Sequence, residues 1–287
     1  MGHAMPLHGA HASLSGWPET VAPALGLLLI AGAYLLLARR AGRRNPGRPW
    51  RRWRSVSFLS GCLLLALALL PPLAPQAHTD FRAHMAQHLL IGMYAPLALV
   101  LGAPATLLLR TLPTARGRQL TTVLNSRPAQ VPAHPAFALL LSTGSLGLLY
   151  FTPLYNATTG GPVGHWLLHA HFLLSGYLFA YVIAGPDPMP SRPGVRSRLV
   201  CLGVAIAAHA VLSQLMYGGF WVDIDAPVEQ VRGAAEIMYY GGDIAELLLA
   251  AALVATWRPA HRTAAGARPK LPWAGHLTSA DECTSRR

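Results

Sequence analysis

Charged residues are scarce in this sequence. They make up 12% of the chain, about half of their usual share in a soluble globular domain, whereas hydrophobic residues make up 53%. This composition excludes an ordinary soluble protein and indicates a membrane protein. Acidic residues are the scarcer charged type, with 11 against 23 basic residues. The formal charge of +12 can be interpreted only once the basic residues have been located along the chain.

Cysteine and the common catalytic motifs are also scarce or missing. Cys62, Cys201 and Cys283 are far apart and form no C-x-x-C motif, so we expect neither a structural disulfide nor a thiolate metal cluster. The sequence has no Gly-rich phosphate loop, no nucleophile elbow and no H-E-x-x-H motif. Neither an ATPase nor a hydrolase is therefore indicated, and we expect a protein that is not an enzyme.

Long apolar runs, by contrast, are frequent. Each is close to the roughly 20 residues that a helix needs to cross a bilayer. The first run lacks a basic leader and a small-residue cleavage site, so we expect a retained helix rather than a signal peptide. Pro71-Pro72 and Pro96 should end or kink their helices. We predict an all-α membrane protein, a seven-transmembrane helix bundle within residues 17–257, with spans at 21–38, 56–74, 84–109, 135–155, 165–184, 199–219 and 234–257.

The basic residues test this arrangement, because membrane proteins concentrate Lys and Arg in their cytoplasmic loops. If seven spans alternate, 21 of the 23 basic residues fall on one side, and only Arg82 and Arg232 fall on the other. This pattern predicts a multi-pass protein of the inner (plasma) membrane, surrounded by lipid, with its N-terminus outside and its C-terminus in the cytoplasm. A topology signal explains the arginines better than nucleic-acid binding does, so we expect no nucleic acid partner.

The two flanking segments differ in composition from the apolar runs. Residues 1–16 are predicted to form an extracytoplasmic arm, and 258–287, rich in Pro, Arg and Ala, to form a disordered cytoplasmic tail. The arm is either a metal-collecting segment or a disordered tail with chance histidines. Its possible ligands are His3, Met5, His8 and His11.

Histidines four residues apart occur at two places. His84 and His88 share one helical face, and His165 and His169 repeat this spacing in a later run. Both runs are expected to enter the membrane from outside, so the four imidazoles should lie at about the same depth. Ionisable residues inside a membrane are costly and usually functional. We therefore predict a metal site between the two helices.

The donor atoms suggest which metal this site would bind. Imidazole suits copper, zinc or iron, and a thioether favours Cu(I), although methionine also fills gaps in apolar packing. His171 lies two residues beyond His169, on a different helical face, so it could instead orient a neighbour or contact a partner. The predicted metal-binding set is His84, His88, His165, His169, His171, Met85 and Met216.

A second polar level is expected deeper in the bundle. His209 and Asp243 should lie at similar depths in the last two spans, and Glu246 shares a helical face with Asp243. One interpretation is a structural His–Asp pair that joins two helices. The other is a relay for protons or metal below the outer site.

Several spaced motifs together resemble one known family. The first, 84–90, reads His-Met-Ala-Gln-His-Leu-Leu, and the other matching segments are 95–96, 101–104, 150–155, 165–172, 176–179 and 185–188. This pattern, spread over roughly 55–257, resembles the CtaG family of bacterial cytochrome c oxidase assembly proteins. The segment 237–243 lacks the tryptophan-containing pattern expected there, which makes the role of Asp243 less secure.

The resemblance implies an inner-membrane protein that helps to mature a haem-copper oxidase, with copper handling at the oxidase copper centre as the suspected task. We hypothesise that copper is bound near the outer face and handed to a cytochrome c oxidase subunit. One alternative is a membrane cytochrome with His88 and His169 as axial ligands of a b-type haem. Another is a proton-coupled transporter that uses His209, Asp243 and Glu246. The oxidation state of the metal, the oxidase served, the oligomeric state and any link between the two levels are not determined by the sequence.

Overall fold

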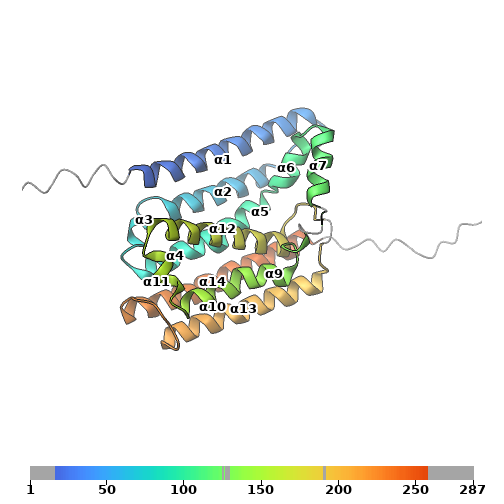
Figure 1. Cartoon of the computed structure of the whole chain (residues 1–287). Coiled ribbons are helices and arrows are strands. Elements are labelled where there is room, and N and C mark those ends of the chain that lie inside the picture. The colour runs from blue at the N-terminus through green and yellow to red at the C-terminus, as the bar shows by residue number, and fades with distance from the viewer. Residues whose placement is uncertain (1–16, 125, 127–129, 190–191, 258–287) are drawn as a thin grey trace, which may run out of the picture. The chain divides into compact units, whose positions relative to one another are not determined.

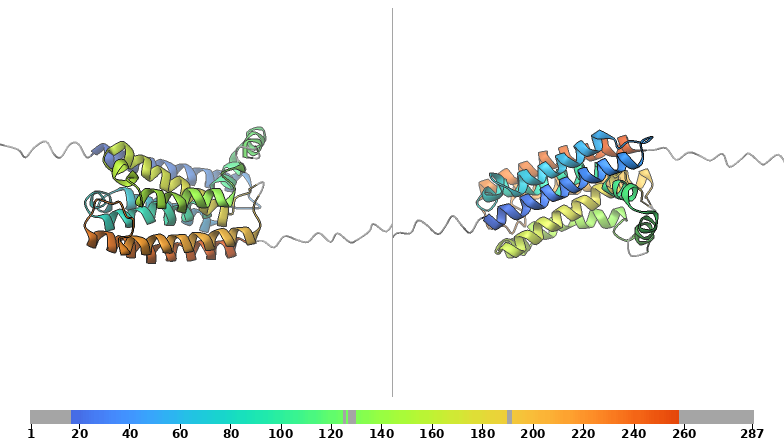
Figure 2. Two further views of the ribbon diagram at one scale, coloured as in Figure 1. Left: turned by 60° about the horizontal axis from the view of Figure 1, so that its bottom comes forward. Right: turned by 90° about the horizontal axis from the view of Figure 1, so that it is seen from above.

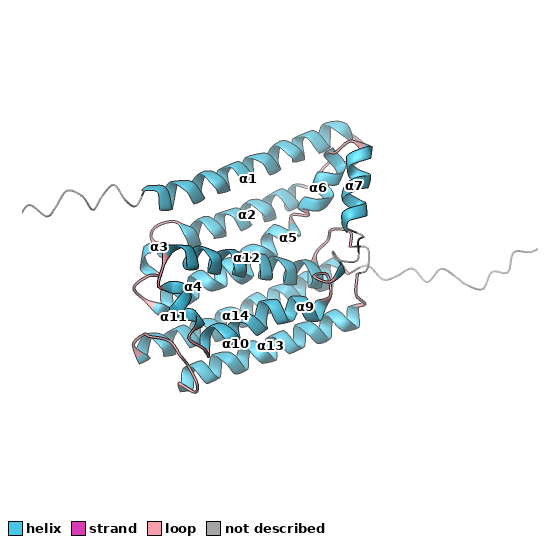
Figure 3. Cartoon of the chain, in the orientation of Figure 1, coloured by secondary structure: helices cyan, strands magenta, loops and turns pink. Residues whose placement is uncertain are grey.

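The described part of the chain is entirely helical. The computed structural model describes residues 17–124, 126, 130–189 and 192–257, and within them all regular secondary structure is helix (Figure 3). This confirms the predicted all-α class. The predicted arm, 1–16, and the predicted tail, 258–287, lie outside the described residues.

Six helical stretches among the described residues are long and apolar enough to cross a membrane. The expected span at 135–155 is instead a shorter apolar stretch, Pro135–Tyr150, built from α9 (Pro135–Leu139), η2 (Leu140–Gly144) and α10 (Ser145–Tyr150). The long stretches are α1 (Trp17–Arg44), α2 (Arg52–Leu69), Phe81–Thr111, α12 (Pro162–Ala184), α13 (Val195–Gly218) and α14 (Val228–Thr256).

The helices lie side by side, as Figures 1 and 2 show. The stretch Phe81–Thr111 consists of α4 (Phe81–Leu89), the π-helix η1 (Leu90–Tyr94), α5 (Ala95–Leu101) and α6 (Pro104–Thr111). Its first half packs against α12, α2 and α14. At one edge α1 packs on α2 and α6, and at the other edge α13 packs on α14 and on the α9–η2 stretch. Side chains of α4 and α12 are therefore held at the centre of the bundle.

Prolines divide the helices where the sequence predicts, and a left-handed residue adds a break that was not predicted. α2 ends at Leu69, just before Pro71-Pro72, and Pro96 stands at the start of α5, directly after the π-helix η1. Ala103 adopts a left-handed conformation with φ of 52° and separates α5 from α6. The remaining short helices are α3 (Leu73–Gln76), α7 (Thr114–Leu124) and α11 (Leu154–Thr159).

Asp187 joins two of the motifs that the sequence singled out. Its buried carboxylate accepts hydrogen bonds from the backbone N–H groups of Ala105 at 3.0 Å and Thr106 at 2.8 Å. These groups belong to the first turn of α6, which would otherwise leave them unpaired. The segment after α12 thus caps α6 from a distance of about eighty residues in sequence. Arg192 in turn donates to the Asp187 carbonyl oxygen.

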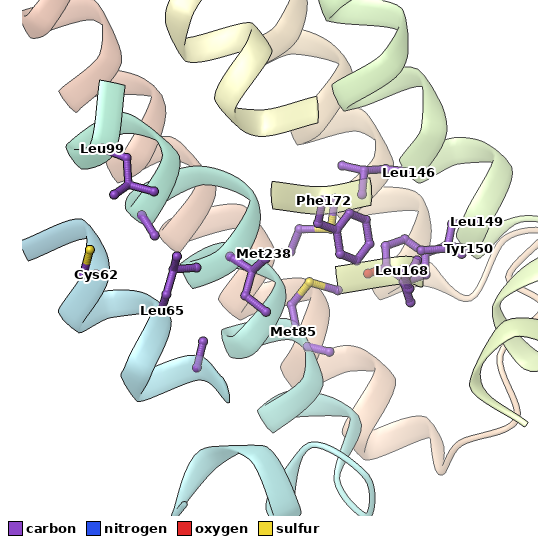
Figure 4. Close-up of a cluster of buried hydrophobic side chains, with 14 of the residues drawn as sticks. Cys62, Leu65, Met85, Leu99, Leu146, Leu149, Tyr150, Leu168, Phe172 and Met238 are labelled. Carbon is purple, nitrogen blue, oxygen red and sulfur yellow. The ribbon is translucent and has the colours of Figure 1, made fainter. Parts of the chain in front are cut away.

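The centre of the bundle is tightly packed. Figure 4 shows Met85 of α4 within a cluster of buried hydrophobic side chains that includes Tyr150 and Phe172. Close by, α12 and η1 approach so closely that a Cβ atom on Gly176 would lie 1.8 Å from the carbonyl oxygen of Gly92. Only glycine at 176 permits this contact, which sets the distance between the two helices that carry the predicted site.

Candidate metal centre

The predicted histidines lie at two separate places in the structure. His84 of α4 and His165 and His169 of α12 gather near the starts of their helices, together with His78 of the preceding loop. We call these four residues the rim cluster. Their ring centroids are 4.5 Å apart for His78 and His165, 4.3 Å for His165 and His169, and 6.4 Å for His84 and His165. The structure thus brings the two predicted helices together.

A pocket of about 260 Å³, which we call the rim pocket, opens beside the rim cluster. His165, His169 and Gln87 line it, and His78, which is exposed, stands at its edge. Apolar and small residues from α1, α2 and α3 form the other walls: Thr20, Leu69, Pro71, Ala74 and Pro75. An ion or a small ligand can therefore reach His165 and His169 from outside the bundle.

Gln87 determines which nitrogen of His169 carries the proton. The Gln87 amide nitrogen donates to the carbonyl oxygen of Ala68 at 2.8 Å, which turns the amide oxygen towards His169. That oxygen lies 3.1 Å from Nε2 of His169 and can only accept, so Nε2 must carry the hydrogen. Nδ1 keeps its lone pair and has no hydrogen-bond partner among the described residues. This is how proteins orient a histidine that binds metal.

His84 is buried behind the pocket. Its side chain is 2% exposed, and within the described chain neither of its ring nitrogens has a hydrogen-bond partner. The ring stacks on Phe81 at 5.6 Å and meets Tyr155 edge-on at 5.1 Å. Buried polar nitrogens are nearly always paired with protein, water or an ion. Two unpaired nitrogens on one ring therefore indicate a site where a ligand atom is expected.

The first turn of α4 also holds an ion pair. Asp80 accepts from the backbone N–H of Arg82 at 2.9 Å and pairs with its guanidinium at 2.8 Å. These hydrogen bonds hold the pKa of the Asp80 carboxyl below its usual value. Because the two charges compensate each other, the ion pair adds no net charge beside the rim cluster.

His88 lines a second space rather than the pocket beside the rim cluster. Four residues along a helix advance the chain by about 6 Å and rotate it by about 40°, so His88 faces a deeper space. There its ring contacts Phe172 at 4.1 Å between centroids.

The deeper space is a cavity of about 40 Å³ between α4, η1, η2, α12, α13 and α14, which we call the core cavity. His209 and Glu246 line it with His88, and Nδ1 of His209 lies 3.4 Å from Oε1 of Glu246. The expected partner of His209 was Asp243, but Asp243 is partly exposed, and its carboxylate has no hydrogen bond or ion pair within the described chain. Glu246, one turn further on, faces His209 instead.

The other predicted ligands have different surroundings. His171 turns away from the rim cluster and lies 2.9 Å from the hydroxyl of Ser145 through its Nε2, as expected from its different helical face. Met85 and Met216 are fully buried in the hydrophobic core. Their positions fit apolar packing, the alternative interpretation of these methionines.

The rim cluster is not a closed metal site. Among the described residues, no three His, Cys, Asp or Glu side chains are already arranged to hold a metal ion. Two imidazoles on one ion, with bonds of about 2 Å, have ring centroids up to roughly 6 Å apart. The neighbouring rings of the rim cluster are at or near this separation, so a metal site there requires rotation of the side chains about χ1 and χ2. The unpaired nitrogens of His84 and His169 fit that requirement.

Sequence reasoning missed Gln87 and placed too much weight on Asp243. Gln87 stands between the two histidines of the first motif and is 1% exposed. A buried amide in a transmembrane helix should have indicated a specific hydrogen-bond partner. Ser142 and Thr143 of η2 also line the core cavity and were not identified, because a π-helix leaves no clear sequence signal.

Taken together, membrane-length helices around buried imidazoles define a multi-pass membrane protein with a candidate metal-binding histidine cluster. The family model described as "Cytochrome c oxidase caa3 assembly factor (Caa3_CtaG)" matches residues 32–260. The chain therefore belongs to this family, and the resemblance seen in the motifs is confirmed.

Curated relatives come from mycobacteria. An uncharacterised protein of Mycobacterium bovis and one of Mycobacterium tuberculosis are each 35% identical over 209 residues, which cover 67% of this chain and 32% of the relative. An uncharacterised protein of Mycobacterium leprae is 31% identical over 242 residues, 77% of this chain and 37% of the relative. The chain thus spans about a third of the length of these relatives. No solved structure matches.

Proposed function

We propose that this chain assists the assembly of a haem-copper cytochrome c oxidase by binding copper at the rim cluster and passing it to an oxidase subunit. Membership of the caa3 assembly factor family supports the oxidase as partner. The copper part rests on one observation: His84 and His169 have buried ring nitrogens without a hydrogen-bond partner among the described residues, and His169 lines an open pocket. Copper is cargo in this account, and no chemical conversion takes place.

The proposal includes an orientation, with seven crossings, the N-terminus outside and the C-terminus in the cytoplasm. Pro135–Tyr150 is then a short crossing, the fourth of the seven in chain order. Basic residues of two loops meet at one end of the bundle, where Arg44 donates to the Thr111 carbonyl oxygen and Arg110 to that of Arg48. His84 lies at the opposite end of the stretch Phe81–Thr111. The positive-inside rule then puts the rim cluster at the outer face of the inner membrane.

The ligands suit a site that must release its metal. His169 offers Nδ1 as an oriented ligand atom for the metal, while His84 offers a ring nitrogen inside the bundle. His78 is exposed at the edge of the pocket, where it can bind an arriving ion first and release it readily. Because neutral imidazoles bind Cu(I) or Cu(II) without adding charge, copper leaves no buried carboxylate behind when it is transferred.

The N-terminal arm is a plausible source of the ion in this proposal. Thr20, near the start of α1, lines the rim pocket, and His11 precedes it by nine residues. We propose that His3, Met5, His8 and His11 collect copper there.

The test is a Cu(I) competition titration of the detergent-purified protein against a chelator of known affinity. His84→Ala/His169→Ala should lose the Cu(I) bound at the rim cluster and so bind less Cu(I) than wild type. His134→Asn is the matched control, because His134 is exposed, caps α9 through Nδ1 and can be replaced there by the capping residue Asn. Equal Cu(I) binding by all three proteins would refute copper handling at the rim cluster. A haem band at one per chain would instead favour the cytochrome alternative.

A further inference from the structure

We propose that the core cavity is a second Cu(I) site, formed by His88, His209 and Met93 about one helical turn deeper than the rim cluster. This inference rests on the proposed function, because it gives copper a second position within the same protein. His84 and His88 stand one turn apart on α4, so the ion moves about 6 Å along one helix between the two sites.

Unpaired polar atoms surround this cavity. Within the described residues, both ring nitrogens of His88, Nε2 of His209 and Oε2 of Glu246 are buried without a hydrogen-bond partner. The three residues are 5%, 4% and 3% exposed. Four such atoms around one space of about 40 Å³ require a ligand, either an ion or about two water molecules.

The pairing of His209 with Glu246 favours a metal over water alone. If Nδ1 of His209 donates its hydrogen to the Glu246 carboxylate 3.4 Å away, Nε2 keeps a lone pair for a metal. A carboxylate behind a histidine is the common arrangement around metal-binding imidazoles. Gly242 leaves the room for this ring, because a Cβ atom there would lie 2.7 Å from Cε1 of His209.

The donor atoms and the charge select Cu(I). Met93 lines the cavity with the two histidines, and two imidazoles with a thioether are ligands that favour Cu(I). One Cu(I) ion beside the single carboxylate of Glu246 gives a neutral site. A divalent ion would leave a net positive charge in a low-dielectric interior, which is costly.

Two π-helical segments form walls of the cavity. Gly92 and Met93 come from η1, and Ser142 and Thr143 come from η2. π-helical turns inside α-helices occur often at functional sites. Here η1 supplies Met93 to the lining of the same cavity as the two histidines.

The experiment is a Cu(I) titration of the full chain in detergent under reducing, anaerobic conditions, with bound copper counted by elemental analysis. In the presence of a competing chelator that removes loosely held Cu(I) from residues 1–16, wild type should hold two Cu(I) ions. His88→Ala/His209→Ala and His84→Ala/His169→Ala should each hold one. X-ray absorption of His84→Ala/His169→Ala loaded with one Cu(I) should show sulfur bound to copper. Met93→Leu, which keeps the side-chain volume, should remove that sulfur signal and weaken binding at least tenfold.

The outcomes separate this inference from the proposed function. If wild type holds one Cu(I) and His84→Ala/His169→Ala holds none, the core cavity contains water and the inference is wrong, while copper handling at the rim cluster stands. If wild type holds two and His88→Ala/His209→Ala still holds two, the second site lies elsewhere and the inference is overturned. If wild type holds none, both proposals fail.

Discussion

The amide oxygen of Gln87 lies 3.1 Å from Nε2 of His169, and the amide nitrogen of Gln87 donates to Ala68 at 2.8 Å. The carbonyl of α2 thus fixes the amide of α4, and the amide fixes the tautomer of a histidine on α12. Contacts among three helices therefore leave Nδ1 of His169, and not Nε2, with a lone pair that can bind a metal ion beside the rim pocket.

Gln87→Leu should therefore weaken Cu(I) binding at the rim cluster about 10–100-fold, the usual effect of losing a residue that orients a metal-binding histidine. Leucine fills the same space but leaves His169 free to adopt either tautomer. The measurement is Cu(I) competition with a chelator. Gln214→Leu is the control, since Gln214 is an exposed residue of another long helix. If both variants bind Cu(I) as tightly as wild type, Gln87 does not orient a ligand.

Asp187→Ala should destabilise the protein without a direct effect on copper. Loss of its carboxylate leaves the N–H groups of Ala105 and Thr106 unpaired, and loss of a helix cap costs about 1–2 kcal/mol. The melting temperature in detergent should fall, and Asp187→Asn, which keeps one oxygen acceptor, should lose less. An unchanged melting temperature for Asp187→Ala would show that the cap is not needed.

Gly176→Ala should disturb the contact between α12 and η1. The added methyl group would overlap the carbonyl oxygen of Gly92, so the helices must separate, and overpacking of this kind costs at least about 1–3 kcal/mol. Gly203→Ala is the matched control, because Gly203 in α13 has open space around it and alanine favours a helix. The measurement is the yield of monodisperse protein and its melting temperature; equal values for the two variants would contradict the close approach.

The orientation predicts the location of a reporter fused after Trp257. Green fluorescent protein at this point should fluoresce, and alkaline phosphatase should be inactive, because the proposed orientation puts the C-terminus in the cytoplasm. Fusions that end in the loop 219–227, between α13 and α14, should show the opposite pattern. An active phosphatase at both points would contradict the alternation of crossings.

The positions of the long helices depend on local composition, so they could be predicted from the sequence. The contacts between side chains of different helices could not. Apolar runs located six long helices, and Pro71-Pro72 located the end of α2, because burial in lipid and proline geometry act locally. Pro135–Tyr150 was expected to extend to 155, but the chain turns at Thr152-Pro153 before α11 begins at Leu154.

The sequence predicted histidines on two helices that lie together in the structure. It did not predict that these histidines line two different spaces. Spacing by four residues places His84 and His88 on one face, yet it also separates them in depth by about 6 Å. The side chains that surround His88 at its depth come partly from α13 and α14, which are far away in the sequence. For the same reason the partner of His209 was identified as Asp243, whereas the rotation of α14 brings Glu246 to it.

The copper content of the assembled oxidase tests the central claim most directly. Cells that depend on this chain would be grown at limiting copper with wild type, His84→Ala/His169→Ala or the control His134→Asn, and copper per haem would be measured in the purified oxidase. The account predicts a full complement of copper with wild type and the control, and an oxidase deficient in copper with the double variant. A fully loaded oxidase from cells with the double variant, present at normal levels in the membrane, would contradict it.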